Sequence, residues 1–84
     1  MQIVWDEPKR QANIAKHGLD FADLTVSFFL AAQVVETRDR RFMAIGRFAD
    51  GTIAVVFAAL GSQGLSIISM RPAGKKEREF HEGI

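Results

Sequence analysis

The spacing of apolar residues in the first third of the chain predicts a short strand followed by two helices. Residues Ile3–Trp5 are β-prone, and good helix formers fill Pro8–His17. Gly18 follows, and glycine commonly ends helices because it adopts positive φ without a Cβ clash. Apolar residues three and four positions apart predict a second helix over Phe21–Leu30, with Asp20 as its cap.

The rest of the chain predicts a β-meander closed by a short charged helix. The dipeptide Asp50-Gly51 lies between two β-prone segments, which is a strong hairpin signal. The segment after it is almost wholly apolar and is expected to be a central strand covered on both faces. Together with the N-terminal part this order indicates an α+β domain with a mostly antiparallel twisted sheet. The predicted elements are strands at Gln33–Glu36, Arg41–Ala49, Thr52–Leu60 and Leu65–Arg71, and a helix at Lys75–His81.

Two loops determine the expected register of the last three strands. A two-residue loop at 50–51 places Ala49 opposite Thr52, and a four-residue loop at 61–64 places Leu60 opposite Leu65. Side chains alternate between the two faces of a sheet, so one face collects most of the apolar residues. The main core is therefore expected on the face of Phe42, Ala44, Phe48, Ile53, Val55, Phe57, Ile68 and Met70.

The opposite face is expected to carry two arginines in one cross-strand row. In the predicted register Arg47, Ala54 and Arg71 lie side by side, with about 10 Å between the two arginine backbones. A small residue between two guanidinium groups leaves space for an anion such as a phosphate, whose oxygens match the planar donor fork of arginine. The alternative is that each arginine pairs with a surface carboxylate or lies in solvent.

Composition limits the remaining classes of function. The 84 residues are expected to form one domain, residues 1–84, and contain no cysteine, which excludes disulfides and thiolate metal sites. Eleven basic and ten acidic residues leave a net charge of +1, so polyanion binding would need a local cluster of positive charge. No apolar segment is long enough to span a membrane, and the N-terminus has no signal-peptide pattern. The expected location is the cytoplasm.

Three segments together resemble the BrnT family of toxins from type II toxin–antitoxin modules. They are IVWDEPKRQANIAKHGLDFADL, RFMAIGRF and LSIISMRPAGKKERE. The resemblance implies a RelE-like fold, endoribonuclease activity without a metal ion or other cofactor, and arrest of translation. It also implies an RNA substrate and a BrnA-type antitoxin with a ribbon-helix-helix part, through which alone the toxin would reach operator DNA. Many members have two arginines after the serine strand and Ser or Thr at the start of the last helix, where this chain has Pro72 and Gly74.

In an RNA-cleaving site, Arg47 and Arg71 are the candidates for stabilising negative charge in the transition state. His17 is the candidate for proton transfer, because the ordinary pKa of histidine, about 6.5, suits that task near neutral pH. The alternative for His17 is a helix-end residue that hydrogen-bonds free carbonyls. Ser69 shares a face with Arg71 and is a candidate phosphate contact, or a small polar residue of the strand.

The candidates for binding RNA are Trp5, Lys16, Lys75 and Lys76. Trp5 can stack on a base, although in so small a domain it is more often part of the core. The two lysines at the start of the last helix oppose the helix dipole, which suggests an anionic partner, or they belong to a solvated charged surface. Glu77 is a possible base, but no pattern places it toward the sheet. The alternative function is a non-catalytic module that binds RNA or protein.

Overall fold

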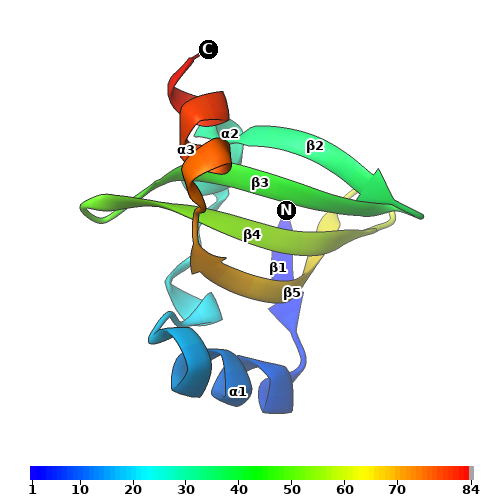
Figure 1. The fold of residues 1–84 in the computed structure, drawn as a ribbon. Helices are drawn as coiled ribbons and strands as arrows, with labels where there is room; N and C mark the ends of the chain where they lie inside the picture. Colours follow the sequence, from blue (N-terminus) through cyan, green and yellow to red (C-terminus); the bar gives the residue numbers. More distant parts are fainter. Residues whose placement is uncertain (84) are drawn as a thin grey trace.

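The computed structural model describes residues 1–83, which form a single mixed sheet of five strands with helices on both of its faces (Figure 1). The strand order is β1-β5-β4-β3-β2, with β1 parallel to β5 and the others antiparallel. The α+β meander predicted from the sequence is therefore confirmed. Its elements are β1 (Gln2–Trp5), α1 (Glu7–His17), the 3-10 helix η1 (Phe21–Asp23), α2 (Val26–Ala31), β2 (Gln33–Arg38), β3 (Arg41–Phe48), β4 (Gly51–Leu60), β5 (Gly64–Pro72) and α3 (Lys75–Glu82).

The single helix predicted for residues 21–30 is wrong, because two short helices occupy this segment. Leu24 between them is extended, with φ −75° and ψ 140°. The Thr25 hydroxyl accepts a hydrogen bond from the Phe28 amide at 3.1 Å and so starts α2. Asp20 caps η1 as expected and accepts from the Ala22 amide at 2.9 Å. A threonine that bonds the backbone ahead of it competes with helix continuation, and this explains the break.

The main core lies between the sheet and the segment formed by η1 and α2. Gly46 of β3 permits close packing there, because a Cβ atom at this position would lie 3.1 Å from the Phe28 ring and 3.2 Å from Ala32. Helix α3 covers the other face of the same strand, as Figure 1 shows. The buried core cluster consists of Phe21, Leu24, Phe28, Phe29, Ala44, Ile53, Val55, Phe57, Ile67 and Met70.

The β3–β4 hairpin differs from the predicted register by two residues. Its loop is Ala49-Asp50, so that Phe48 lies opposite Gly51, and Ala49 takes a positive φ of 54°. Arg47 consequently lies opposite Thr52. A shift of two residues leaves every side chain on its original face, and the hydrophobic pattern therefore cannot distinguish the two registers.

The β4–β5 hairpin contains two deviations from prediction that cancel. Its loop has three residues rather than four, so that Leu60 lies opposite Gly64. An irregularity at Ile68 then restores the predicted pairing of Ala54 with Arg71. Between the loop and this irregularity the side chains exchange faces, and it is Ile67, only 1% exposed, that enters the core in place of Ile68.

Helix α1 is attached to the free edge of β5 by a buried asparagine. Strand β1 pairs with β5 only as far as Ile67, which leaves the Met70 backbone without a strand partner on that side. The Asn13 side-chain amide donates to the Met70 carbonyl at 2.8 Å and accepts from the Met70 amide at 3.1 Å. The helix ends at Gly18, as predicted, with φ 70°. Asn13 thus replaces a neighbouring strand at this edge.

The β2–β3 turn provides a test of local strain. Asp39 and Arg40 both have positive φ, 42° and 68°, and arginine at such a position costs roughly 1–2 kcal/mol. We expect Arg40→Gly to raise the free energy of unfolding by about 1 kcal/mol, measured by urea denaturation. Arg41→Gly removes the same charge from a strand and should lower stability. A loss of stability in Arg40→Gly would contradict the backbone geometry.

Candidate functional site

The two candidate arginines lie on the same face of the sheet, as predicted, but on a diagonal rather than in one row. Arg71 is opposite Ala54, whereas Arg47 is opposite Thr52, two residues further along β4. From strand spacing and rise per residue, their Cα atoms are about 12 Å apart. Two arginine side chains can span this separation and meet at one phosphate, so the change of register does not separate them.

The space expected between the arginines is covered by α3. Ala54 is fully buried and Ile45 is 3% exposed on this face. Glu77 of α3 reaches the sheet and accepts two hydrogen bonds from the Arg71 guanidinium, both at 2.8 Å. The expectation of an open vacancy above Ala54 is therefore wrong, because the covering helix supplies a carboxylate there.

Glu77 is held in position by its own helix. Its carboxylate also accepts a hydrogen bond from the Gly74 amide at 2.8 Å, the contact that a glutamate at the third helical position makes with the N-cap residue. The Arg71 guanidinium lowers the pKa of Glu77 to about 2, so this side chain is an anion at neutral pH. Sequence reasoning did not place Glu77 on the sheet. The signal that would have found it is its spacing of three residues from Gly74.

Arg71 keeps free donors although it is paired. Its Nη1 and Nη2 atoms bind Glu77, and Nη1 also donates to the Pro72 carbonyl at 3.3 Å. Within residues 1–83 the Nε–H group makes no hydrogen bond. The exposed Arg47 likewise has neither a hydrogen bond nor an ion pair in this part of the chain. The site therefore presents to an anion one guanidinium that Glu77 orients and one exposed guanidinium that has no partner in residues 1–83.

Ser69 and His17 differ in their relation to the arginines. Ser69 is half-buried, lies opposite Val56, and is on the face of Arg71. His17 is half-buried at the end of α1, the helix that packs beside β5. In the described residues no hydrogen bond or ion pair joins His17 to either arginine. The structure therefore groups Ser69 with the site and leaves His17 without a contact to it.

The remaining candidates are divided between core and surface. The Trp5 ring lies against the core, with an edge-to-face contact to Phe21 at 6.5 Å, and its Nε1 donates to Glu7 at 3.2 Å. The lysines Lys16, Lys75 and Lys76 are exposed, the last two in the first turn of α3. His81 of α3 is half-buried, and its Nδ1 atom is buried without a hydrogen-bond partner.

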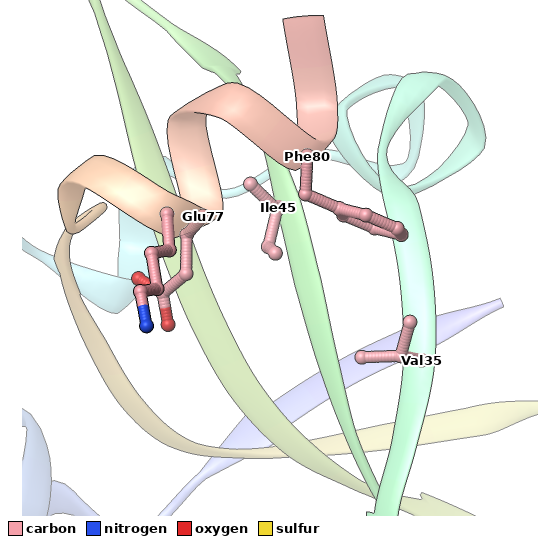
Figure 2. A pocket seen from close by; sticks show the side chains of 5 residues that line it. Val35, Ile45, Glu77 and Phe80 are labelled. Atoms are coloured by element: carbon pink, nitrogen blue, oxygen red, sulfur yellow. The ribbon is translucent and has the colours of Figure 1, made fainter. Parts of the chain in front are cut away.

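Next to the Arg71–Glu77 pair, β2, β3 and α3 border an open pocket of about 260 Å³ (Figure 2). Val35 and Ile45 line it from the sheet, and Phe80 lines it from α3. Lys76 and Glu77 complete the wall. Sequence reasoning did not find this pocket, because it depends on where α3 crosses the strands.

Residues 1–83 contain neither a cluster of metal-ligand side chains nor a membrane-spanning helix. No three side chains of His, Asp or Glu come together there as metal ligands would. None of the helices in the described part is long and apolar enough to cross a membrane.

Comparison with known proteins identifies a family and a solved relative of this chain. The family model described as "Ribonuclease toxin, BrnT, of type II toxin-antitoxin system" matches residues 5–77. The Brucella abortus ribonuclease toxin BrnT, whose crystal structure is solved, has 60% sequence identity to this chain. The two structures superpose with a TM-score of 0.85, and the match covers 89% of this chain and 99% of that one. No curated protein sequence matches the chain.

Proposed function

Because the chain belongs to the BrnT family of ribonuclease toxins of type II toxin–antitoxin systems, we propose that it cleaves RNA internally at the face of Arg47 and Arg71, without a metal ion, and arrests translation in the cytoplasm. The observation that carries this proposal is the pair of guanidinium groups on one face, one of them oriented by Glu77.

The proposed reaction uses the RNA's own 2′-hydroxyl as nucleophile. Its oxygen attacks the adjacent phosphorus, the bond to the 5′-oxygen breaks, and a 2′,3′-cyclic phosphate and a 5′-hydroxyl remain. Arg47 and the Nε side of Arg71 bind the non-bridging oxygens and stabilise the extra negative charge of the transition state. Ser69 donates to the same phosphate. Glu77, an anion with a pKa of about 2, is a weak base and acts by fixing the orientation of Arg71.

Proton transfer is assigned to His17 on chemical type. Among the side chains of this protein, only histidine ordinarily titrates near neutral pH, and the chain has two histidines. We expect His17→Ala to lower kcat by about 10²–10⁴-fold. His81→Ala is the matched control and should retain most of the activity. The opposite ranking of the two variants would transfer this role to His81 on α3.

The type II family implies an antitoxin partner and an RNA substrate. We assign the partner to the BrnA type, with a ribbon-helix-helix part that brings the toxin to operator DNA. Covering the face of Arg47 and the first turn of α3 with acidic side chains would neutralise the site by occupying its cations.

The experiment that tests the function is incubation of the purified protein with RNA in EDTA. Cleavage with 2′,3′-cyclic phosphate ends is the expected result. Binding without cleavage would instead support the non-catalytic module of the same fold. Cleavage that begins only when a divalent ion is added would refute metal independence.

A further inference from the structure

We propose that the pocket between β2, β3 and α3 binds one unpaired nucleobase of the RNA, next to the phosphodiester that is cleaved, with Phe80 as the stacking surface. This inference rests on the proposed function and adds to it a subsite for the substrate. Neither the two arginines nor the proton-transfer residue belongs to this pocket.

The walls of the pocket suit the flat, apolar face of a base. Val35 and Ile45 belong to adjacent strands, β2 and β3, and face the same side of the sheet, since Val35 pairs with Met43 and Ile45 with Gln33. In Figure 2 Phe80 extends from α3 toward β2 above Val35, and Ile45 lies between Phe80 and Glu77. Phe80 remains 42% exposed although it is aromatic. Such a ring is a platform for stacking, which tolerates any base because every base has a π-face.

The size of the pocket fits a small planar group. Its volume of about 260 Å³ lies below the roughly 300–1,000 Å³ of sites that enclose drug-sized molecules. A single base, held on one side by the sheet and on the other by an aromatic ring, needs no larger space. An extended helix or strand of a protein partner would need a longer groove.

The position of the pocket connects it to the proposed cleavage site. Glu77 lines the pocket and also binds Arg71 through two hydrogen bonds at 2.8 Å. A nucleotide whose base enters the pocket therefore has its phosphate near the guanidinium of Arg71. Lys76 lines the same pocket, and Lys75 precedes it on the exposed first turn of α3. These cations match the charge of an RNA backbone, and this charge favours RNA as the occupant over an uncharged apolar side chain.

The pocket is tested by binding rather than by cleavage. The probe is a short single-stranded RNA with 2′-deoxy nucleotides, which lack the attacking hydroxyl and cannot be cleaved by the proposed reaction. Stacking on an aromatic side chain contributes roughly 1–3 kcal/mol per base, so Phe80→Ala should weaken binding by about 5- to 150-fold. Phe80→Tyr keeps the ring and should bind like the wild type. Leu30→Ala, which removes an exposed apolar side chain of α2, should have no effect.

A second comparison identifies the base. A single abasic nucleotide is placed in turn at each position of the probe. At one position, the abasic nucleotide should weaken binding to the wild type by the same factor as Phe80→Ala weakens binding to the intact RNA. Phe80→Ala with this abasic RNA should bind little more weakly than with either change alone. Equal binding by Phe80→Ala and wild type, or losses that multiply at every position, would refute the pocket. Loss of antitoxin binding alone in Phe80→Ala would also refute it and assign the pocket to the protein partner.

The two proposals can fail separately. If the wild type binds the probe through Phe80 but leaves all-ribose RNA intact, the pocket stands and the catalytic proposal fails. If cleavage occurs and Phe80→Ala cleaves with unchanged KM and kcat, the catalytic proposal stands and the pocket fails. Thermal unfolding of each variant confirms that it is folded.

Discussion

Replacement of Arg71 by alanine should lower kcat for RNA cleavage by about 10²–10³-fold, the loss that follows removal of one preorganised donor from a transition state. The same variant should lose growth inhibition when it is produced without antitoxin. Arg71→Lys keeps the charge but loses the planar fork, and should recover only part of the activity. Both effects are measured with purified protein on a single-stranded RNA substrate.

The matched control for Arg71 is Glu77→Gln, which keeps the shape of the partner and removes its charge. Arg71 then keeps its positive charge but loses its charged anchor, so the loss of kcat should be smaller than in Arg71→Ala.

Arg71→Ala should also return the pKa of Glu77 from about 2 toward its ordinary value of 4.5. The pair therefore stabilises the fold above pH 4.5, and this contribution is lost as the pH falls from 4.5 to about 2. A partly exposed pair of this kind contributes up to about 1 kcal/mol. Arg71→Ala should consequently remain folded at neutral pH, and full activity in this variant would refute the assignment of Arg71.

Replacement of Asn13 by leucine should cause the largest loss of stability among the polar residues discussed above. Asn13 is 7% exposed, and its amide satisfies both the amide and the carbonyl of Met70. Leucine has a similar size but cannot bond either group, and each buried backbone group left unpaired costs roughly 1–3 kcal/mol. The free energy of unfolding, measured by urea denaturation, should fall accordingly. Gln11→Ala removes an exposed amide of the same helix that bonds Glu7, and should change stability by less than about 0.5 kcal/mol. Equal effects of the two substitutions would show that Asn13 does not replace a strand at the edge of β5.

The meander order of β2 to β5 and most of the side-chain faces could be read from the sequence, because alternation and turn residues are local signals. The parallel pairing of β1 with β5 and the entry of Ile67 into the core in place of Ile68 could not. The register of the strands was harder to predict. The Ala49-Asp50 loop and the predicted Asp50-Gly51 loop place the same side chains on the same faces, so only the backbone decides between them. The loop before Gly64 is one residue shorter than predicted, and the extra residue at Ile68 compensates for this difference in register. The predicted pairing of Ala54 with Arg71 was therefore correct, although neither the loop length nor the irregularity was predicted correctly.

Only the residues of the candidate site that belong to the sheet were predicted from the sequence. The shared face of Arg47, Ser69 and Arg71 follows from alternation. The pairing of Arg71 with Glu77 does not, because it depends on the direction in which α3 leaves Pro72 and crosses the sheet. The same crossing creates the pocket beside Phe80. Tertiary placement of a short helix with no buried residue of its own leaves little trace in the hydrophobic pattern of the chain.

The position of α3 changes how the site is understood. Two unpaired arginines would form a simple anion-binding site. Here the Glu77 carboxylate binds the Nη atoms of Arg71 and leaves its Nε–H group free. A carboxylate so close to a bound phosphate opposes it electrostatically, and this cost is offset if Glu77 holds Arg71 in the geometry that the transition state requires. The smaller expected effect of Glu77→Gln relative to Arg71→Ala is a direct consequence of this division of roles.

The most direct test of the central claim is a crystal structure of the protein with a single-stranded RNA blocked by 2′-deoxy nucleotides. We expect one phosphate whose non-bridging oxygens lie within hydrogen-bond distance of both Arg47 and the Nε atom of Arg71. RNA bound elsewhere on the protein, for example at the β2–β3 turn, with both arginines unoccupied, would contradict this expectation.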